Sequence, residues 1–181
     1  EKETSIIASL QFITAKPVLY VCNVDESAAV SGNDYVTQVK EAVKEEGAEV
    51  IVLAVGTEAD IAELDDFEER QIFLEDIGLA EAGAAKLIRA AYKLLNLQTY
   101  FTVGVKEVRA WTIPIGATAP EAAGVIHTDF EKGFIRAEVI KYEDYVHYGT
   151  EVKIKEAGKL GVEGKEYVVQ DGDIMNFRFN V

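Results

Sequence analysis

Several residue types are scarce in this sequence of 181 residues, and each scarcity excludes a class of protein. The single cysteine, Cys22, rules out a disulfide framework and fits a reducing compartment. Every apolar run is far shorter than a membrane-spanning helix, and no signal-peptide pattern opens the sequence. We therefore expect a cytoplasmic protein with no membrane partner. Because the sequence starts with Glu1 and not with Met, we expect a fragment or a processed chain.

Basic residues are also scarce, since the formal net charge is -14. Residues 1–97 carry 8 Lys/Arg and 19 Asp/Glu, whereas residues 98–181 carry 10 and 13. Nucleic-acid-binding domains usually present a basic face, so this balance argues against DNA and against a simple polyanion as partner. The uneven charge predicts that the two halves do different things.

The first half follows the pattern of a β-α-β unit in a parallel sheet. Apolar runs predict strands over residues 18–22 and 50–55, and a helix over 34–46 lies between Asn33 as N-cap and Gly47. The β-α-β order predicts that the two strands are parallel. Three further helices are expected: one after a capping box at Thr57, one over residues 65–76 and one over residues 80–95. Residues 5–13 resemble the end of a helix.

A polar stretch, Asn-Val-Asp-Glu, follows the first expected strand directly, from Asn23 to Glu26. Ligands bind outside the carboxyl ends of parallel strands, and both expected strands end at the same rim. An amide that donates and accepts, with a carboxylate three residues later, can grip a planar heterocycle such as a nucleobase. On spacing alone, an Asx turn with ordinary loop charges is the stronger interpretation.

From residue 97 onward the sequence becomes β-rich and aromatic. Strands are expected over residues 99–103, 108–114 and 135–142, with a short helix over 119–125 after Thr118. Asp171-Gly172 predicts a hairpin between strands over residues 165–170 and 174–181. In the last strand, Met175, Phe177, Phe179 and Val181 alternate with polar residues, which predicts one buried face.

Two longer stretches resemble a known family. The stretch AKPVLYVCNVDE resembles the base-recognition segment of the YchF family of Obg-like P-loop NTPases, which has Asn-x-x-Glu where most GTPases have Asn-Lys-x-Asp. The stretches FTVGVKEVRAWTIPIGATAPEAAGVIHTDFEKGFIRAEVIKYEDY and EAGKLGVEGKEYVVQDGDIMNFRFNV resemble its carboxyl-terminal TGS domain. The resemblance covers essentially residues 12–181.

The resemblance implies an α/β fold in two domains. Residues 1–96 would be the distal portion of a parallel-sheet P-loop NTPase domain, and residues 97–181 a ubiquitin-like β-grasp (TGS) domain. The residues implied in base binding are Asn23, Val24, Glu26, Ala54, Val55 and Gly56. The last three residues differ from the Ser-Ala-Lys of most family members. The difference removes a serine hydroxyl and a lysine side chain from the implied pocket but keeps the backbone N–H groups. Glu26 in place of the guanine-reading Asp implies ATP as the preferred nucleotide over GTP.

Catalysis is not expected from this chain by itself. The sequence contains no G-x-x-x-x-G-K-[ST] phosphate-binding loop. The resemblance implies that the phosphate and Mg²⁺ ligands lie upstream of Glu1, in a parent ATPase or GTPase. We therefore expect no catalytic or metal-binding residue here, weak nucleotide binding, and no hydrolysis by the chain alone.

Related TGS domains imply contact with the ribosome, its RNA or its proteins. Five basic residues of this half have two interpretations, a basic strip or a solvated face of mixed charge, and the second is slightly preferred. They are Lys106, Arg109, Lys132, Arg136 and Arg178. A stand-alone interaction module without catalysis is therefore the alternative function.

Three remaining features have structural interpretations. His127 with Asp129 and Glu131 is more simply a hydrogen-bonding histidine than a metal or catalytic site, and His147 a surface residue. Trp111 is expected in packing, and Asp171 and Asp173 as turn formers.

Overall fold

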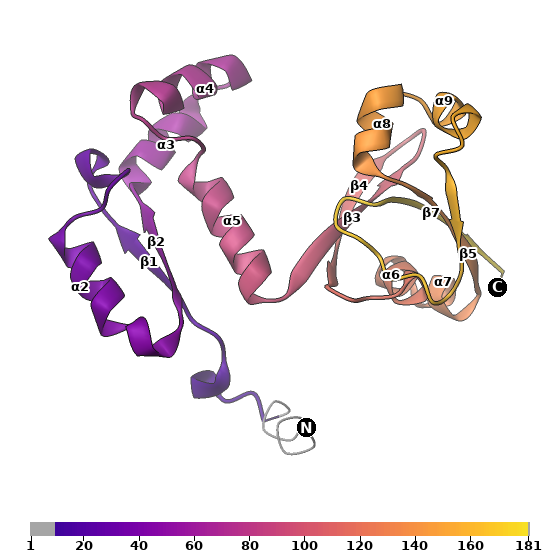
Figure 1. The fold of residues 1–181 in the computed structure, drawn as a ribbon, viewed down its shortest axis with the longest axis horizontal. Helices are drawn as coiled ribbons and strands as arrows, with labels where there is room; N and C mark the ends of the chain where they lie inside the picture. Colours follow the sequence, from indigo (N-terminus) through magenta and orange to yellow (C-terminus); the bar gives the residue numbers. More distant parts are fainter. Residues whose placement is uncertain (1–9, 181) are drawn as a thin grey trace. The chain divides into compact units, whose positions relative to one another are not determined.

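A computed structural model describes residues 10–180 of the chain (Figure 1). The chain divides into two compact units, Glu1–Leu95 and Asn96–Val181. The helix expected over residues 5–13 lies mostly outside the described residues. Its described part contains a turn and the 3₁₀ helix η1 (Ile13–Ala15).

The first unit contains the expected parallel strand pair. Strands β1 (Leu19–Asn23) and β2 (Glu49–Leu53) pair in parallel, with Asn23 opposite Leu53 at the carboxyl end. The connection contains η2 (Glu26–Ala28), α2 (Asp34–Ala42) and η3 (Lys44–Glu46). The prediction of a β-α-β unit is therefore confirmed.

Helix α2 begins and its connection ends where the sequence predicts. The Asn33 side chain accepts a hydrogen bond from the Val36 N–H at 3.1 Å, and Val36 and Val43 are buried. Gly47, at φ 66°, supplies the left-handed residue that ends the connection.

The predicted second strand ends too late in the sequence. Strand β2 stops at Leu53, and Val55 is the first residue of helix α3 (Val55–Glu63). The proposed capping box at Thr57 is also wrong, because Thr57 lies buried inside α3 at 4% exposure. Local propensity favoured a strand at Val55, but a side chain from β1 caps the helix there instead.

Two further helices complete the first unit. Helix α4 (Phe67–Asp76) follows Asp66, whose carboxylate accepts a hydrogen bond from the Glu68 N–H. Helix α5 (Gly83–Leu94) packs on β2 and β1, and its Ala90 joins a cluster of buried residues with Ile51 and Leu53. The apolar side chains Ile88 and Leu95 point away from this cluster, since both are 58% exposed.

The second unit is built on one five-stranded sheet with the order β4-β3-β7-β5-β6. Strand β3 (Leu97–Val103) pairs antiparallel with β4 (Val108–Pro114) and parallel with β7 (Ile174–Phe179). Strand β5 (Phe134–Ile140) pairs antiparallel with β7 and with β6 (Gly161–Glu163). This mixed sheet, with a short helix on one face, is the expected β-grasp arrangement.

The predicted hairpin around Asp171-Gly172 is wrong. Residues 165–170 form no named strand and contribute one bridge, Thr118 to Val168. The turn is fastened to β3 instead, because the Thr99 N–H donates to the Asp171 carboxylate and the Gly172 N–H donates to the Thr99 carbonyl, both at 2.8 Å. The chain therefore enters the sheet between β3 and β5 rather than folding back on itself.

Four short helices pack around the sheet. The expected helix after Thr118 is α6 (Ala119–Ile126), and Thr118 and Glu121 form its capping box. The sequence did not predict the other three, α7 (Thr128–Lys132), α8 (Tyr142–Tyr148) and α9 (Glu151–Glu156). The strand predicted to reach residue 142 ends at Ile140, because Tyr142 begins α8.

Strand β7 shows the expected alternation. Met175 and Phe177 are buried with Tyr100 and Ala122 in the main core, whereas Asn176 and Arg178 are exposed. Phe179 is 36% exposed and stacks on Phe130, and Val181 lies outside the described residues. Trp111 packs at the margin of the same core, as expected for a packing residue.

Candidate functional site

The two loops of interest leave the sheet at the same edge. Strand β1 ends at Asn23, which lies opposite Leu53 at the end of β2. The Val24 N–H donates to the Leu53 carbonyl at 2.8 Å, and the Val55 N–H donates to Asn23 Oδ1 at 3.1 Å. The loop after β1 and the loop after β2 are therefore joined directly by hydrogen bonds. We call this edge the rim, defined by residues 23–26 and 54–56.

Asn23 acts as the cap of helix α3 from a distant position in the sequence. Ala54 precedes that helix and makes no side-chain cap hydrogen bond. The first helical N–H, on Val55, is satisfied by Asn23 Oδ1 instead. Within residues 10–180 the Asn23 Nδ2 group has no hydrogen-bond partner, so a donor remains available beside the rim.

Glu26 places an exposed carboxylate at the rim. It begins η2, and Ala28 in η2 and Ala29 directly after it are both buried. Their N–H groups donate to the carbonyls of Asp25 and Glu26. The Glu26 side chain is exposed, and in the described part of the chain it has no hydrogen-bond or ion-pair partner. It can therefore accept hydrogen bonds from a ligand.

The second loop begins with a buried residue and continues with two exposed ones. Ala54 is 4% exposed, whereas Val55 is 51% exposed and Gly56 is also exposed. A Cβ placed on Gly56 would meet no atom within 4 Å. The loop therefore offers the positive amino end of α3 with free space above it.

Glu58 joins helix α3 to helix α5, a role that no sequence pattern predicted. Its carboxylate accepts hydrogen bonds from the N–H groups of Gly83 at 2.6 Å and Ala84 at 3.0 Å, which caps helix α5. A side chain at Gly83 would collide with Leu53 and with the Glu58 carboxylate. The partners lie about 25 residues apart, so no local pattern reveals them.

The histidines and the basic residues take the structural roles that the sequence favoured. His127 Nδ1 accepts a hydrogen bond from the Asp129 N–H at the start of α7. His147 is exposed. Arg136 and Arg178 both face Glu138, and the Arg109 guanidinium lies 4.1 Å from the centre of the Trp111 ring, which is typical of a mixed-charge surface.

Asp173 does more than form a turn. Its side chain is completely buried and receives hydrogen bonds from Lys141 Nζ at 2.6 Å, the Tyr167 hydroxyl at 2.7 Å and the Gln170 N–H at 2.9 Å. Burial disfavours the charged form of Lys141, but its hydrogen bonds to Asp173 and Tyr167 outweigh that cost and raise its pKa. Burial also raises the pKa of Tyr167. This network joins the start of β7 to the end of β5.

Among residues 10–180, no group of three or more His, Cys, Asp or Glu side chains is placed to hold a metal ion. Nor does any helix in that range have the length and apolarity needed to cross a membrane.

Known proteins match the chain along its whole length. The family model YchF-GTPase_C, described as a protein of unknown function (DUF933), matches residues 97–180. The ribosome-binding ATPase YchF of Escherichia coli O157:H7 is 58% identical over 180 residues, and that of Bacillus subtilis is 54% identical over 183. The alignments cover 99% and 100% of this chain but 49% and 50% of those proteins, so the chain spans about half their length.

A solved structure gives the same answer. The structure of the Schizosaccharomyces pombe YchF GTPase superposes with a TM-score of 0.84 at 39% identity, covering 98% of this chain and 47% of that one. The fold, the family model and the relatives agree with the resemblance carried by AKPVLYVCNVDE and by the second half. The chain belongs to the YchF family.

Proposed function

We propose that the rim is the purine-binding edge of a ribosome-associated NTPase that prefers ATP to GTP. In this proposal Asn23, Val24 and Glu26 contact the base from one side, and residues 54–56 form the other wall. The relatives named as ribosome-binding ATPases support a nucleotide-binding function at the level of the family.

The observation that carries the proposal is the hydrogen bond between the Val55 N–H and Asn23 Oδ1. It holds two loops, far apart in the sequence, at the carboxyl edge of a parallel sheet, where ligands bind in such folds. Both loops keep unused groups there: the Nδ2 of Asn23, the carboxylate of Glu26 and the open side of Gly56. These groups fit a planar base with donors and acceptors along its edge.

Base preference follows from the chemistry of Glu26. Guanine presents two donors, N1–H and the exocyclic amine, to a single carboxylate in ordinary GTPases. Adenine presents one donor, its N6 amine, and has an acceptor at N1. The sequence has no lysine after Asn23, and Glu26 has a longer stem than Asp, which weakens the paired contact to guanine.

The phosphates and Mg²⁺ require residues that this sequence does not supply. When bound, Mg²⁺ neutralises charge on the β- and γ-phosphates and supports phosphoryl transfer. This chain's own contribution is to bind and orient the base and to keep the wall of the pocket in place through Asn23 and Glu58. Hydrolysis is proposed for the parent protein, and the chain alone is proposed to be inactive and to bind nucleotide weakly.

The second unit is proposed to be a TGS domain that contributes the contact with the ribosome. Support comes from relatives named ribosome-binding ATPases and from the family match over residues 97–180. A cytoplasmic location follows from that partner.

The test is Asn23→Ala in the parent protein, with Asn33→Ala as matched control. Each change removes one side-chain helix cap, so both should cost about 1 kcal/mol of stability. Only Asn23→Ala should weaken ATP binding, by about tenfold, because Asn33 is not one of the rim residues. Fluorescent-nucleotide titration at matched folded fraction measures this, and equal affinities for the two variants would refute the base-binding role.

Glu26→Asp sharpens the claim about base preference. Restoring the shorter carboxylate should move the ratio of ATP to GTP affinity toward GTP in the parent protein. Competition of the two nucleotides for the same labelled probe gives the ratio. An unchanged ratio would mean that Glu26 does not read the base.

The alternative is an interaction module that works without nucleotide. It is favoured by one observation: the second unit contains its own core, from Tyr100 to Phe177. Co-sedimentation of the 181-residue chain with ribosomal particles, without nucleotide, compares the two functions. Binding as strong as that of the parent protein would favour the module.

A further inference from the structure

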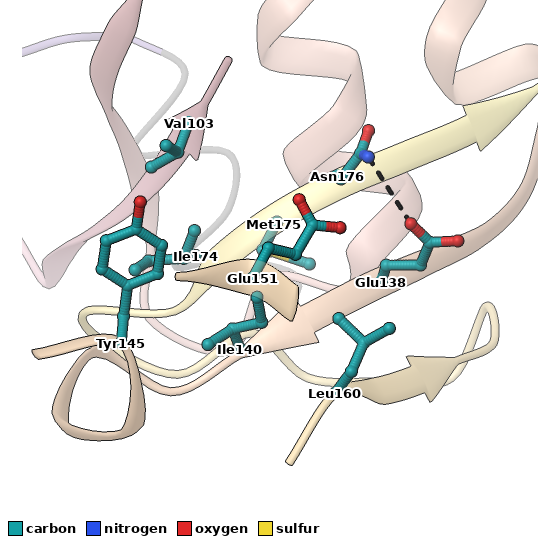
Figure 2. Close-up of a pocket in the computed structure, with 9 residues that line it drawn as sticks. All are labelled: Val103, Glu138, Ile140, Tyr145, Glu151, Leu160, Ile174, Met175 and Asn176. Carbon is teal, nitrogen blue, oxygen red and sulfur yellow. Dashed lines mark hydrogen bonds between the residues drawn. The ribbon is translucent and has the colours of Figure 1, made fainter. Parts of the chain in front are cut away.

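A small pocket opens in the second unit on the sheet face that carries α8 and α9 (Figure 2). Alternate residues of β5 and β7 define the two faces. Ala137, Val139, Met175 and Phe177 pack in the core with α6, whereas Ile140 and Ile174 pack with Ile154 of α9. The pocket lies at the edge of this second, smaller cluster, and we call it the α8–α9 pocket.

The walls of the α8–α9 pocket are partly apolar and partly polar. Figure 2 shows the apolar side chains, contributed by the ends of β3, β5 and β7, by α8 and by the residue before β6: Val103, Ile140, Ile174, Tyr145 and Leu160. The cavity volume is about 60 Å³. A water molecule in the liquid occupies about 30 Å³. The pocket therefore takes the end of one side chain and is too small for a nucleobase with its ribose.

Two carboxylates border the pocket, and they differ in the number of their hydrogen-bond and ion-pair partners. Glu138 is held by Arg178, with Nη2 to Oε2 at 3.0 Å, by Asn176 at 3.5 Å, and more distantly by Arg136. Glu151, the first residue of α9, is exposed and has no hydrogen-bond or ion-pair partner in the part of the chain that the structure describes. One unpaired carboxylate therefore borders a pocket the size of a side chain, with apolar side chains on part of its wall.

We propose that the α8–α9 pocket binds a lysine side chain from a basic polypeptide segment, an inference that rests on the proposed contact with the ribosome and names its chemistry. The aliphatic stem packs on Ile140, Ile174 and Leu160, and the ammonium group pairs with Glu151. Residues 98–181 carry 13 Asp/Glu against 10 Lys/Arg, a small acidic excess that favours a basic segment over a polyanion. RNA is the less favoured partner, because Glu151 repels phosphate and the nearby Arg136 and Arg178 already face Glu138.

The pocket is tested directly on the 181-residue chain with a synthetic heptapeptide that alternates valine and lysine. The control peptide carries norleucine in place of lysine, which keeps the stem and removes the charge. We expect the lysine peptide to shift the methyl signals of Ile140 and Ile174 and the control peptide to bind at least about fivefold more weakly. Equal binding of the two peptides, or no shift at these methyl groups, would overturn the proposal.

Two variants test separately the charge of Glu151 and the space inside the pocket. Glu151→Gln should weaken the lysine peptide by about fivefold to tenfold, whereas Glu156→Gln, on the same helix but away from the pocket, should leave it unchanged. Val103→Phe fills the pocket without changing charge and should abolish the methyl shifts. Thermal unfolding of each variant checks that the fold is kept. Normal binding by Glu151→Gln would overturn the proposal even if another variant failed to fold.

Two further measurements separate this inference from the function on which it rests. If the parent protein co-sediments with ribosomes and Glu151→Gln does not weaken it, the pocket is wrong and the ribosome function stands. If the parent does not co-sediment, the proposed function fails, while the peptide titration still decides the pocket. Binding of a single-stranded RNA 20-mer that depends on Arg136 and Arg178, without peptide binding, would assign this face to RNA instead.

Discussion

The two units bury their apolar residues in different ways. In the second unit, β3, β4, β5, β7 and α6 all contribute to one cluster around Tyr100 and Phe177. The first unit has a small cluster of Ile51, Leu53 and Ala90, and its β1 leaves Val21 46% exposed. Among the described residues of the first unit, the sheet consists of the two strands β1 and β2. The candidate ligand rim belongs to the less enclosed unit, whereas the α8–α9 pocket belongs to the better enclosed one.

The largest expected effect separates the two units. Phe177→Ala removes a ring from the main core of the second unit and should cost about 3–5 kcal/mol of its stability. Trp111, the single tryptophan, reports on the second unit, and the single cysteine, Cys22, reports on the first. In a urea titration the Trp111 fluorescence transition should shift to lower urea while Cys22 labelling stays unchanged. If both reporters shift together, the units do not unfold independently.

The next largest effect concerns the stability of the first unit. Gly83→Ala drives a methyl group into Leu53 and the Glu58 carboxylate and should cost about 1–3 kcal/mol. Gly56→Ala is the matched control, since nothing lies within 4 Å of the added carbon, and it should be neutral within about 0.5 kcal/mol. Cys22 labelling in urea measures both variants. A neutral result for Gly83→Ala would mean that the Leu53 and Glu58 side chains can turn aside without loss.

The smallest expected effect concerns alkaline pH and the second unit. Burial raises the pKa of Tyr100, whose hydroxyl donates to the Ala122 carbonyl at 2.8 Å. The unfolded tyrosine loses its proton first, at about pH 10, so the stabilisation is present below that pH and is lost as pH rises above it. The loss from Tyr100 is about 1.4 kcal/mol per pH unit, and the raised pKa values of Tyr167 and Lys141 act in the same direction.

Tyr100→Phe isolates that contribution. The variant should be less stable at neutral pH, because the Ala122 carbonyl loses its donor, but its stability should fall less steeply between about pH 10 and 11. Urea midpoints from Trp111 fluorescence at several pH values give the slopes. Parallel slopes for wild type and variant would show that Tyr100 does not control the alkaline transition.

Sequence reasoning succeeded where the signal was local or repeated. The parallel pair of β1 and β2 followed from two β-branched runs with a helix between them, and the Asn33 and Thr118 caps followed from residues one to three positions from the helix start. Because parallel strands end at one rim, Asn23 and residues 54–56 were expected near one another. Their roles in binding a base stay predictions.

Other features were missed because their partners are distant in the sequence. Asp171-Gly172 has the composition of a hairpin turn, but its hydrogen bonds go to Thr99, about 72 residues earlier. Glu58 and Asp173 look like ordinary surface carboxylates, yet one caps α5 and the other is buried beside Lys141. Helices α8 and α9 are too short to show a periodic apolar pattern, and packing on Ile140 and Ile174 holds them.

The position of β7 in the sheet has a consequence for synthesis. It is the middle strand, yet the ribosome makes it after each of the four strands that surround it. While residues 97–163 emerge, β3 and β5 have no common neighbour, and the apolar side chains of both remain accessible to solvent or to chaperones. The nascent second unit therefore cannot close its core until residues 174–179 have left the exit tunnel, so its folding is a late, single event rather than a gradual one.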